Sequence, residues 1–167
     1  METLYDKLRI YGRSDYYGFH MPGHTRLPGM EGLERLYQID LTEIEGFDDL
    51  HHAEGILRQA QERAASVYRA GETHYLINGS TAGLLSAVLG STRRGERILM
   101  ARNCHKSVYN AVLLNELEPV YIYPRQLGGT ELNDQMTPRE VGRLLDANPD
   151  IKVTVITSPT YDGVVSD

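Results

Sequence analysis

The sequence lacks the features that stabilise secreted proteins or hold proteins in a membrane. Its 167 residues include a single cysteine, Cys104, so no disulfide can form within the chain. No apolar run approaches the ~20 residues that a membrane-spanning helix needs. Residues 1–13 lack the apolar stretch of a secretory signal. We therefore expect a cytoplasmic protein that has no membrane partner.

Basic residues are too few for a nucleic-acid-binding face. The chain has 17 Lys and Arg against 23 Asp and Glu, which gives a formal net charge of -6. With 41% hydrophobic and 24% charged residues, the composition is that of a folded chain, and its length suits one domain. Small molecules are therefore the expected partners, rather than nucleic acid.

The first part of the chain, residues 1–50, has the sequence of an irregular arm. Residues 11–19 are rich in Gly and Tyr, and Pro-Gly pairs at 22–23 and 28–29 interrupt any helix. No apolar period of 2 or 3.6 residues is evident. Such a segment buries little of its own surface, so we expect it to pack on the rest of the chain or to reach a partner subunit.

The second part, residues 51–167, alternates between helices and strands. Apolar spacing predicts helices that begin near residues 52, 80, 105 and 137, and β-prone runs predict strands over 74–77, 97–100, 120–123 and 152–157. Short connections predict right-handed βαβ units in a largely parallel sheet of about four strands. The run Val153–Ile156 is typical of a central strand, yet only eleven residues follow it. We expect oligomerisation or a C-terminal continuation to complete the sheet.

The first candidate site is Asn78–Gly83, with the sequence NGSTAG, between a predicted strand and a predicted helix. At such a junction the free N–H groups and the positive end of the helix dipole attract an anion, and glycines let a phosphate approach closely. The hydroxyls of Ser80 and Thr81 add donors. The alternative is that Ser80 or Thr81 caps the helix while Gly79 makes the turn.

The second candidate site is Arg102–Ser107, with the sequence RNCHKS, which also lies between a strand and a helix. The carboxyl ends of parallel strands meet at one edge of an open sheet, so this segment and Asn78–Gly83 are expected at the same edge. His105 could stack on a flat cofactor or carry a proton, or it could be a surface or capping histidine. Cys104 is more typical of a small buried residue than of a nucleophile.

Two other sets of residues have simpler explanations. Ser158–Gly163 follows the last predicted strand and could face a ligand, but its Pro, Asp and Gly are ordinary turn residues. His20 and His24 have the spacing of helical metal ligands, but Pro22 and Gly23 exclude the helix that would place them on one face. We expect no metal site.

Five segments together carry a family resemblance: Phe19–His24, Asp48–His51, Asn78–Thr81, Arg102–Ser107 and Ser158–Gly163. In this order and spacing they resemble the Orn/Lys/Arg decarboxylases, and the chain looks like the short bacterial form of these pyridoxal 5'-phosphate enzymes. The resemblance runs from about Tyr17 to Gly163. It implies an α/β fold of the aspartate-aminotransferase type, a partial three-layer α/β/α large domain with a mostly parallel sheet. Residues 51–167 would be the N-terminal part of the cofactor-binding domain, preceded by the arm of residues 1–50.

The resemblance also assigns roles to residues of both candidate sites. It implies that the backbone at Gly79 and the hydroxyls of Ser80 and Thr81 bind the cofactor phosphate, in agreement with the argument from the helix terminus. It implies that His105 is a catalytic residue that stacks on the pyridine ring of the cofactor. Pyridoxal phosphate is thus the expected cofactor.

Three residues of the arm and its junction form a further group of candidates. The resemblance places His24, Asp49 and His51 around the mouth of the active site, partly near a subunit boundary. We assign them no step in the reaction. Thr25 stands where the family usually has a lysine after Pro-Gly-His, so this loop departs from the family pattern.

Two groups that the family chemistry requires are not found where the resemblance would place them. Such an enzyme needs a lysine that binds the cofactor covalently and an acid on the pyridine nitrogen. The family has both beyond the position of Asp167, and Lys7, Lys106 and Lys152 are not in the appropriate context. We expect the N-terminal part of an oligomeric decarboxylase of lysine, ornithine or arginine, inactive alone.

Two alternatives remain open. The same fold and cofactor could serve an aminotransferase or another lyase, although the Pro-Gly-His and Asn-Cys-His-Lys-Ser segments argue against this. A non-catalytic domain that binds a phosphorylated ligand, or that regulates a full-length homologue, is compatible with the missing lysine.

Overall fold

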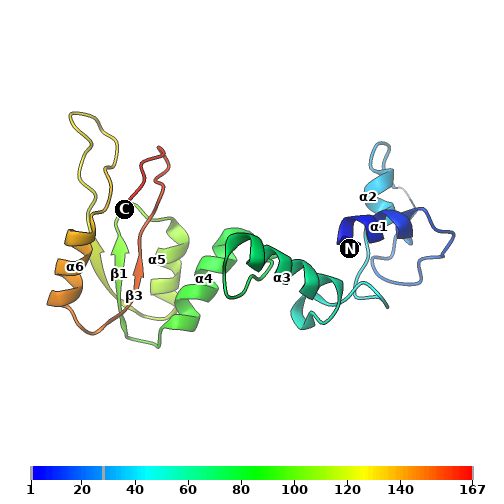
Figure 1. Ribbon diagram of the computed structural model, residues 1–167, viewed down its shortest axis with the longest axis horizontal. Coiled ribbons are helices and arrows are strands. Elements are labelled where there is room, and N and C mark those ends of the chain that lie inside the picture. The colour runs from blue at the N-terminus through cyan, green and yellow to red at the C-terminus, as the bar shows by residue number, and fades with distance from the viewer. Residues whose placement is uncertain (1, 28, 167) are drawn as a thin grey trace. The chain divides into compact units, whose positions relative to one another are not determined.

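The computed structural model describes residues 2–27 and 29–166, which form two compact units (Figure 1). The first unit ends at Tyr75 and the second begins at Leu76. This division lies later in the chain than residue 50, because helix α3 (Ile56–Tyr68) contacts helix α1 (Leu4–Gly12) and so belongs to the first unit. The assignment of residues 1–50 to an arm and of 51–167 to a cofactor domain stays a prediction.

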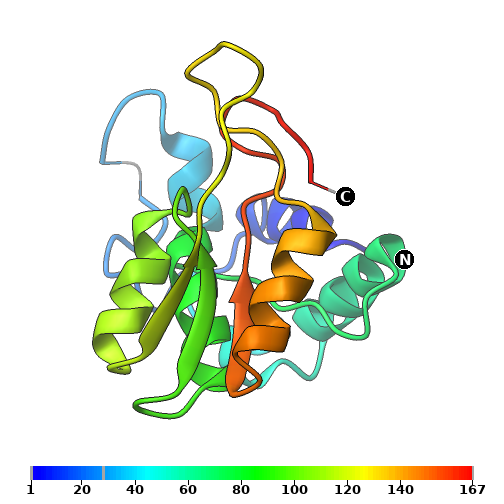
Figure 2. The ribbon, with the colours of Figure 1, turned by 90° about the vertical axis from the view of Figure 1, so that its left-hand side faces the viewer.

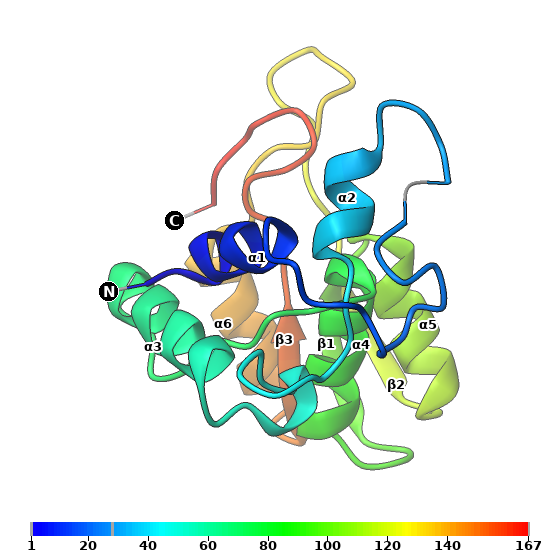
Figure 3. The same cartoon turned by 90° about the vertical axis from the view of Figure 1, so that its right-hand side faces the viewer.

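The first unit is helical. Besides α1 and α3 it contains α2 (Glu34–Ile39) and the short 3-10 helix η1 (Leu50–His52), and α1 packs against α2 (Figure 3). Helix α1 differs from the expectation of an arm without regular structure. It begins at a capping box, in which the Thr3 hydroxyl accepts from the Asp6 N–H at 3.1 Å and the Asp6 carboxylate accepts from the Thr3 N–H at 3.4 Å. Between α1 and α2 the described residues form neither helix nor strand, as the Pro-Gly pairs predict.

Asp48 determines where α3 begins. One of its carboxylate oxygens accepts from the N–H groups of Gly55 and Leu57 at 2.8 and 3.0 Å, and the other accepts from those of Asp49 and Glu54, both at 3.0 Å. The N–H groups of Glu54, Gly55 and Leu57 would otherwise lack partners at the start of the helix. Burial raises the pKa of Asp48, but the four N–H donors outweigh it and lower the pKa from 3.8 to about 2.

The second unit is an α/β layer structure with the strands β1 (Arg97–Ala101), β2 (Glu118–Ile122) and β3 (Ile151–Val155). All three strands are parallel, in the order β2-β1-β3 (Figure 2). In the register, Leu99 of β1 lies between Val120 of β2 and Thr154 of β3. The parallel sheet is confirmed.

The expected strand at residues 74–77 is not formed, so the sheet has three strands rather than about four. Among the described residues this segment pairs with no strand, and Leu76 and Ile77 are more than half exposed. A β-prone run becomes a strand only where a neighbouring strand offers its free N–H and C=O groups. Both sides of β1 are taken by β2 and β3, and residues 74–77 pair with neither outer edge of the sheet.

Helices cover both faces of the sheet. On one face, Ile98 and Met100 pack with residues of α4 (Gly79–Ser91) and α5 (Lys106–Leu114). On the other face, Leu99 and Ala101 pack with residues of α6 (Pro138–Ala147). All four of these β1 residues are fully buried. The expected three-layer arrangement is therefore present, and Figure 2 shows α5 and α6 on opposite sides of the strands.

The central strand is β1 rather than the run Val153–Ile156. In β3 the side chains alternate, with Lys152 and Thr154 exposed and their neighbours partly buried, because the strand lies at an edge of the three-stranded sheet. Apolar composition alone therefore misplaced the centre of the sheet. Helix α6 matches its prediction, since Thr137 is the N-cap in a capping box with Glu140 and Pro138 takes the first helical position.

Candidate cofactor-binding site

The N-terminus of α4 is an exposed, uncapped helix end. The helix begins at Gly79, whose φ of 67° lies in the left-handed region, and the N-cap Asn78 makes no side-chain hydrogen bond to it. Ser80 and Thr81 lie within the first turn and are exposed, so neither is the N-cap that the simpler interpretation required. The backbone N–H groups of this turn, with two hydroxyls beside them, form an arrangement suited to an anion.

There is room for an anion beside Gly79. A Cβ placed on this residue would meet no atom within 4 Å outside its chain neighbours and the backbone of its own helix. Glycine is therefore required by the backbone angle rather than by crowding. No other part of the described chain covers this side of Gly79.

His105 is the N-cap of α5, at the carboxyl end of β1. Its Nδ1 accepts from the Ser107 N–H at 3.3 Å and lies 2.9 Å from the Ser107 Oγ. Because Nδ1 is an acceptor in this contact, the neutral ring carries its proton on Nε2. Ser107 is fully buried and the imidazole is exposed. His105 therefore combines a capping role with an anchored ring that remains open to a ligand.

Ser107 and Asn103 contribute to this site in ways that their place in the motif did not reveal. Ser107 fixes the imidazole through the two contacts to Nδ1. The Oδ1 atom of Asn103 is buried and has no hydrogen-bond partner in the described part of the chain. Burying an unpaired amide oxygen is unfavourable, so this atom is a strained point of the loop. Only burial could have identified these two residues.

The remaining residues of the loop have structural roles. Cys104 packs against the apolar residues of both faces of the sheet. Burial raises the pKa of its thiol, which is the opposite of what a nucleophile needs. This agrees with its prediction as a small buried residue. Lys106 is exposed and is the first residue of α5.

Ser158–Gly163 forms a turn after β3. Thr160 is buried, its N–H donates to the Val164 carbonyl at 2.8 Å, and its hydroxyl accepts from the Val164 N–H at 3.1 Å. The Gly163 N–H donates back to the Thr160 carbonyl at 3.0 Å. These contacts account for the turn residues, as the simpler interpretation predicted. Tyr161 is fully exposed.

The candidates from the first unit make local contacts. His24 is held between two partners: its Nδ1 accepts from the Arg26 N–H at 3.1 Å and its Nε2 lies 3.3 Å from the Asp40 carboxylate. Asp49 caps η1 by accepting from the His51 N–H at 2.8 Å. This hydrogen bond is the main cause of the lowered pKa of Asp49, and a contact with the His52 ring adds to it.

The two groups of candidates thus fall in different units. Gly79–Thr81 and His105 belong to the second unit, at the N-termini of two helices, α4 and α5, that pack against each other. His24, Asp49 and His51 belong to the first unit.

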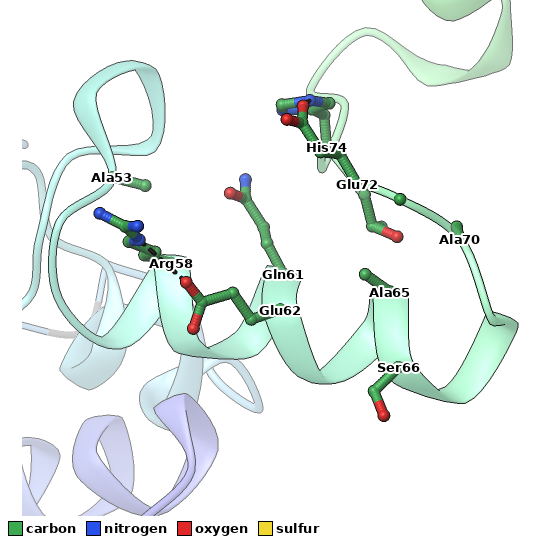
Figure 4. Close-up of a pocket in the computed structure, with 11 residues that line it drawn as sticks. Ala53, Arg58, Gln61, Glu62, Ala65, Ser66, Ala70, Glu72 and His74 are labelled. Carbon is green, nitrogen blue, oxygen red and sulfur yellow. Dashed lines mark hydrogen bonds and ion pairs between the residues drawn. The ribbon is translucent and has the colours of Figure 1, made fainter.

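The first unit has a cavity of about 480 Å³ between α3 and the segment that follows it (Figure 4). Its charged side chains pair with each other, since Arg58 lies 2.9 Å from Glu62 and His74 lies 3.1 Å from Glu72. None of the predicted site residues lines it. Among the described residues, no helix is long and apolar enough to cross a membrane.

Comparison with known proteins identifies the family of the chain. Residues 2–167 match the family described as Orn/Lys/Arg decarboxylase, major domain. The chain is 38% identical to the Bacillus subtilis protein YaaO over 169 residues, 98% of this chain and 35% of that protein. It is 34% identical to an arginine decarboxylase of Halalkalibacterium halodurans over 155 residues, 89% of this chain and 32% of that enzyme.

Solved structures show the same fold. The constitutive lysine decarboxylase of E. coli matches with a TM-score of 0.70 and 22% identity, over 96% of this chain and 25% of that enzyme. Lysine decarboxylase A of Pseudomonas aeruginosa matches with a TM-score of 0.70 and 22% identity, over 98% of this chain and 25% of that enzyme. Both have the aspartate-aminotransferase type of fold, which confirms the predicted fold class. The chain spans about a third of the length of the curated relatives. By its sequence match over residues 2–167, it belongs to the Orn/Lys/Arg decarboxylase family.

Proposed function

We propose that the second unit binds the phosphate of pyridoxal 5'-phosphate at the N-terminus of α4 and the pyridine ring of the cofactor against His105. The observation that carries the proposal is the uncapped helix end at Gly79, with the exposed hydroxyls of Ser80 and Thr81 beside it. Backbone N–H groups, hydroxyls and the helix dipole are the donors that a phosphate dianion requires.

The residues present fit the rest of the cofactor as well. The imidazole of His105 is exposed, and Ser107 fixes its orientation, so one face of the ring can lie against a flat heterocycle. Asn103, whose Oδ1 is buried without a partner among the described residues, lies close to His105 in the sequence. Both residues belong to the loop that begins at the carboxyl end of β1, which is where ligands bind in open α/β sheets.

We further propose that the chain forms part of a decarboxylase that converts lysine, ornithine or arginine into the corresponding amine and CO2, a step of polyamine synthesis. The cofactor would supply a ring that accepts the electron pair left when CO2 departs. The residues of this chain would anchor the phosphate and orient the ring. The arginine and lysine decarboxylases among the relatives support a basic amino acid as substrate.

The chain by itself is proposed to be inactive. Its three lysines are Lys7, Lys106 and Lys152, and none lies in a segment typical of the lysine that holds the cofactor. We expect the working enzyme to be a cytoplasmic homo-oligomer in which His24, Asp49 and His51 lie near the mouth of the active site. Asp49 would then act through the fold of its loop, since it caps η1.

A phosphate-binding measurement tests the proposal. The probe is 4'-deoxypyridoxine 5'-phosphate, which has the cofactor's ring and phosphate but no aldehyde to react with lysines. We expect it to shift the amide resonances of residues 79–82, and the variant Ser80→Ala with Thr81→Ala to bind it at least tenfold more weakly, because charge-assisted hydrogen bonds are lost. Ser86→Ala with Ser91→Ala, farther along α4 and also exposed, is the matched control.

Two results would contradict the proposal. Unchanged affinity of the variant Ser80→Ala with Thr81→Ala would show that these hydroxyls do not bind the phosphate. Release of CO2 from lysine, ornithine or arginine by the purified chain with pyridoxal phosphate would refute the proposed inactivity.

A non-catalytic role in binding a phosphorylated ligand is the second candidate, because an uncapped helix end with two hydroxyls suits any phosphate. It predicts the same phosphate site without a preference for a pyridine ring. Equal affinity for the pyridine probe and for phenyl phosphate at residues 79–82 would support it over the cofactor.

A further inference from the structure

We infer that the first unit has a separate binding site for the phosphate group of a small organic phosphate, in the cavity between α1 and α2. This inference does not rest on the proposed cofactor site, which belongs to the other unit. The cavity has a volume of about 250 Å³ and is lined by Tyr5, Leu8, Arg9, Gly12, Arg13, Arg35, Gln38 and Ile39.

The charges in this cavity are of one sign. Three guanidinium groups, those of Arg9, Arg13 and Arg35, line it together with the amide of Gln38, and no carboxylate does. Acidic residues nevertheless outnumber basic ones both in the whole chain and in residues 1–75. Within the described residues, Arg13 and Arg35 form no ion pair, and Arg9 lies only at 4.0 Å from Asp6. Three cationic side chains around one cavity give it a positive potential, which favours an anion there.

The end of helix α1 does not account for Arg9 and Arg13. A cation near a helix C-terminus usually stabilises the last carbonyl groups. Here Arg26 already does so: its guanidinium donates to the carbonyls of Tyr11 and Gly12 at 2.8 and 3.0 Å, and it lies over the Tyr11 ring at 4.6 Å. Arg9 and Arg13 are exposed instead, with their donors available to a ligand.

The position of Arg35 is unfavourable for the helix that carries it. It lies in the first turn of α2 (Glu34–Ile39), where the helix dipole favours an anion. The acid of that turn, Glu34, is bound to the Gly32 N–H at 3.0 Å rather than to Arg35. An anion in the cavity would compensate the charge of Arg35 where its own helix does not.

The geometry of the cavity selects a phosphate with a small organic part. Three guanidinium groups present more donors than the two oxygens of a carboxylate can accept, whereas a phosphate monoester has three terminal oxygens and two charges. Tyr5 and Ile39 provide an apolar wall for the organic part. The volume is roughly eight times the ~30 Å³ of a water molecule in the liquid, enough for a phosphate with one small ring.

Gly12 keeps the two helices close enough to form the cavity. It is buried, and a Cβ placed on it would lie 3.1 Å from the Cγ2 atom of Ile39 and 3.5 Å from the carbonyl oxygen of Gln38. A larger residue there would push α2 away from α1. The cavity therefore depends on a close approach that glycine permits.

The test uses phenyl phosphate and the full 167-residue chain in buffer free of phosphate. We expect it to shift the resonances of Arg13, Arg35 and Gln38 with a dissociation constant at least tenfold lower than that of benzoate. Arg13→Gln with Arg35→Gln should weaken this binding at least tenfold. The matched control is Arg63→Gln with Arg69→Gln, two exposed arginines that do not line the cavity, and it should bind as the unchanged chain does.

The outcomes separate this site from the cofactor site. Ser80→Ala with Thr81→Ala should leave the shifts at Arg13 and Arg35 unchanged, whatever happens at residues 79–82. Absence of shifts around the cavity, equal affinity for benzoate, or unchanged binding by the Arg13 and Arg35 variant would each overturn the inference. Circular dichroism of each variant should match that of the unchanged chain, because the substituted arginines are exposed.

Discussion

Replacing Asp48 by Asn should destabilise the start of α3 and reveal how much the carboxylate contributes. Asn has the same shape, keeps one acceptor oxygen, and tolerates the left-handed backbone that Asp48 adopts at φ 71°. The substitution removes the charge and replaces one acceptor oxygen by an amide NH2 group, which cannot accept from the two N–H groups bound to that oxygen. Asp48→Ala is the more severe companion, because it leaves all four N–H groups without their acceptor.

The size of the effect follows from the pKa. A decrease in pKa from 3.8 to about 2 means that folding favours the charged over the protonated carboxyl group by about 2.4 kcal/mol. The side chain is partly exposed, so solvent reduces this figure, and we expect about 1–2 kcal/mol for Asp48→Asn at pH 7. Because the folded-state pKa lies below the unfolded value, this stability is complete well above pH 3.8. It is lost as the pH falls from about 4.5 to about 2.

Amide hydrogen exchange at Leu57 and urea unfolding measure this effect. At pH 7 we expect Asp48→Asn to raise the exchange rate at Leu57 roughly tenfold, since each ~1.4 kcal/mol changes the open population tenfold. The difference in unfolding free energy between the two proteins should shrink as the pH approaches 3. Equal stability at pH 7, or a difference that stays constant down to pH 3, would refute the assignment of the carboxylate as the cap of α3.

Two further predictions concern the second unit. Leu99→Ala should lower the free energy of unfolding by about 2–5 kcal/mol, because the side chain is fully buried in β1. Leu114→Ala is the control: its side chain is 64% exposed, so the free energy of unfolding should change by less than about 0.5 kcal/mol. Similar urea midpoints for both variants would contradict the described core. Cys104 should react more slowly with a disulfide reagent in the folded protein than in urea, because burial raises the pKa of its thiol and so lowers the thiolate fraction; equal rates would show that the thiol is not shielded.

Local sequence patterns predicted the helices and strands of the second unit because each of them carries its own signal. The N-cap Thr137 followed by Pro138 marks the start of α6, and the run from Arg97 marks β1. The capping pair Thr3 and Asp6 is the corresponding signal for α1, and it lies in a segment without a clear apolar period. Residues 74–77 show the limit of such patterns, since strand formation depends on a partner that local sequence does not specify.

The candidate site was also predictable only in part from local sequence. A glycine and two hydroxyl residues at a helix start indicate an anion site from sequence alone, and the structure shows this helix end uncapped. The anchoring of His105 by Ser107 and the unpaired Oδ1 of Asn103 depend on burial, which emerges only when the loop packs on the sheet. The cavity between α1 and α2 was equally hidden, because residues 9 and 35 are far apart in the chain.

The order of strands in the sheet has a consequence for how the second unit acquires its structure. Strand β1 pairs with β2, which follows it after the single helix α5. Its other neighbour, β3, lies much later in the sequence and begins at Ile151. Pairing between residues so distant in sequence is slow because the loop between them must first close. During synthesis we therefore expect α4 and α5 to pack on their face of β1 first, while the face with Leu99 stays uncovered until α6 and β3 have formed. Until then the emerging chain exposes this apolar face, to which chaperones or an early partner could bind.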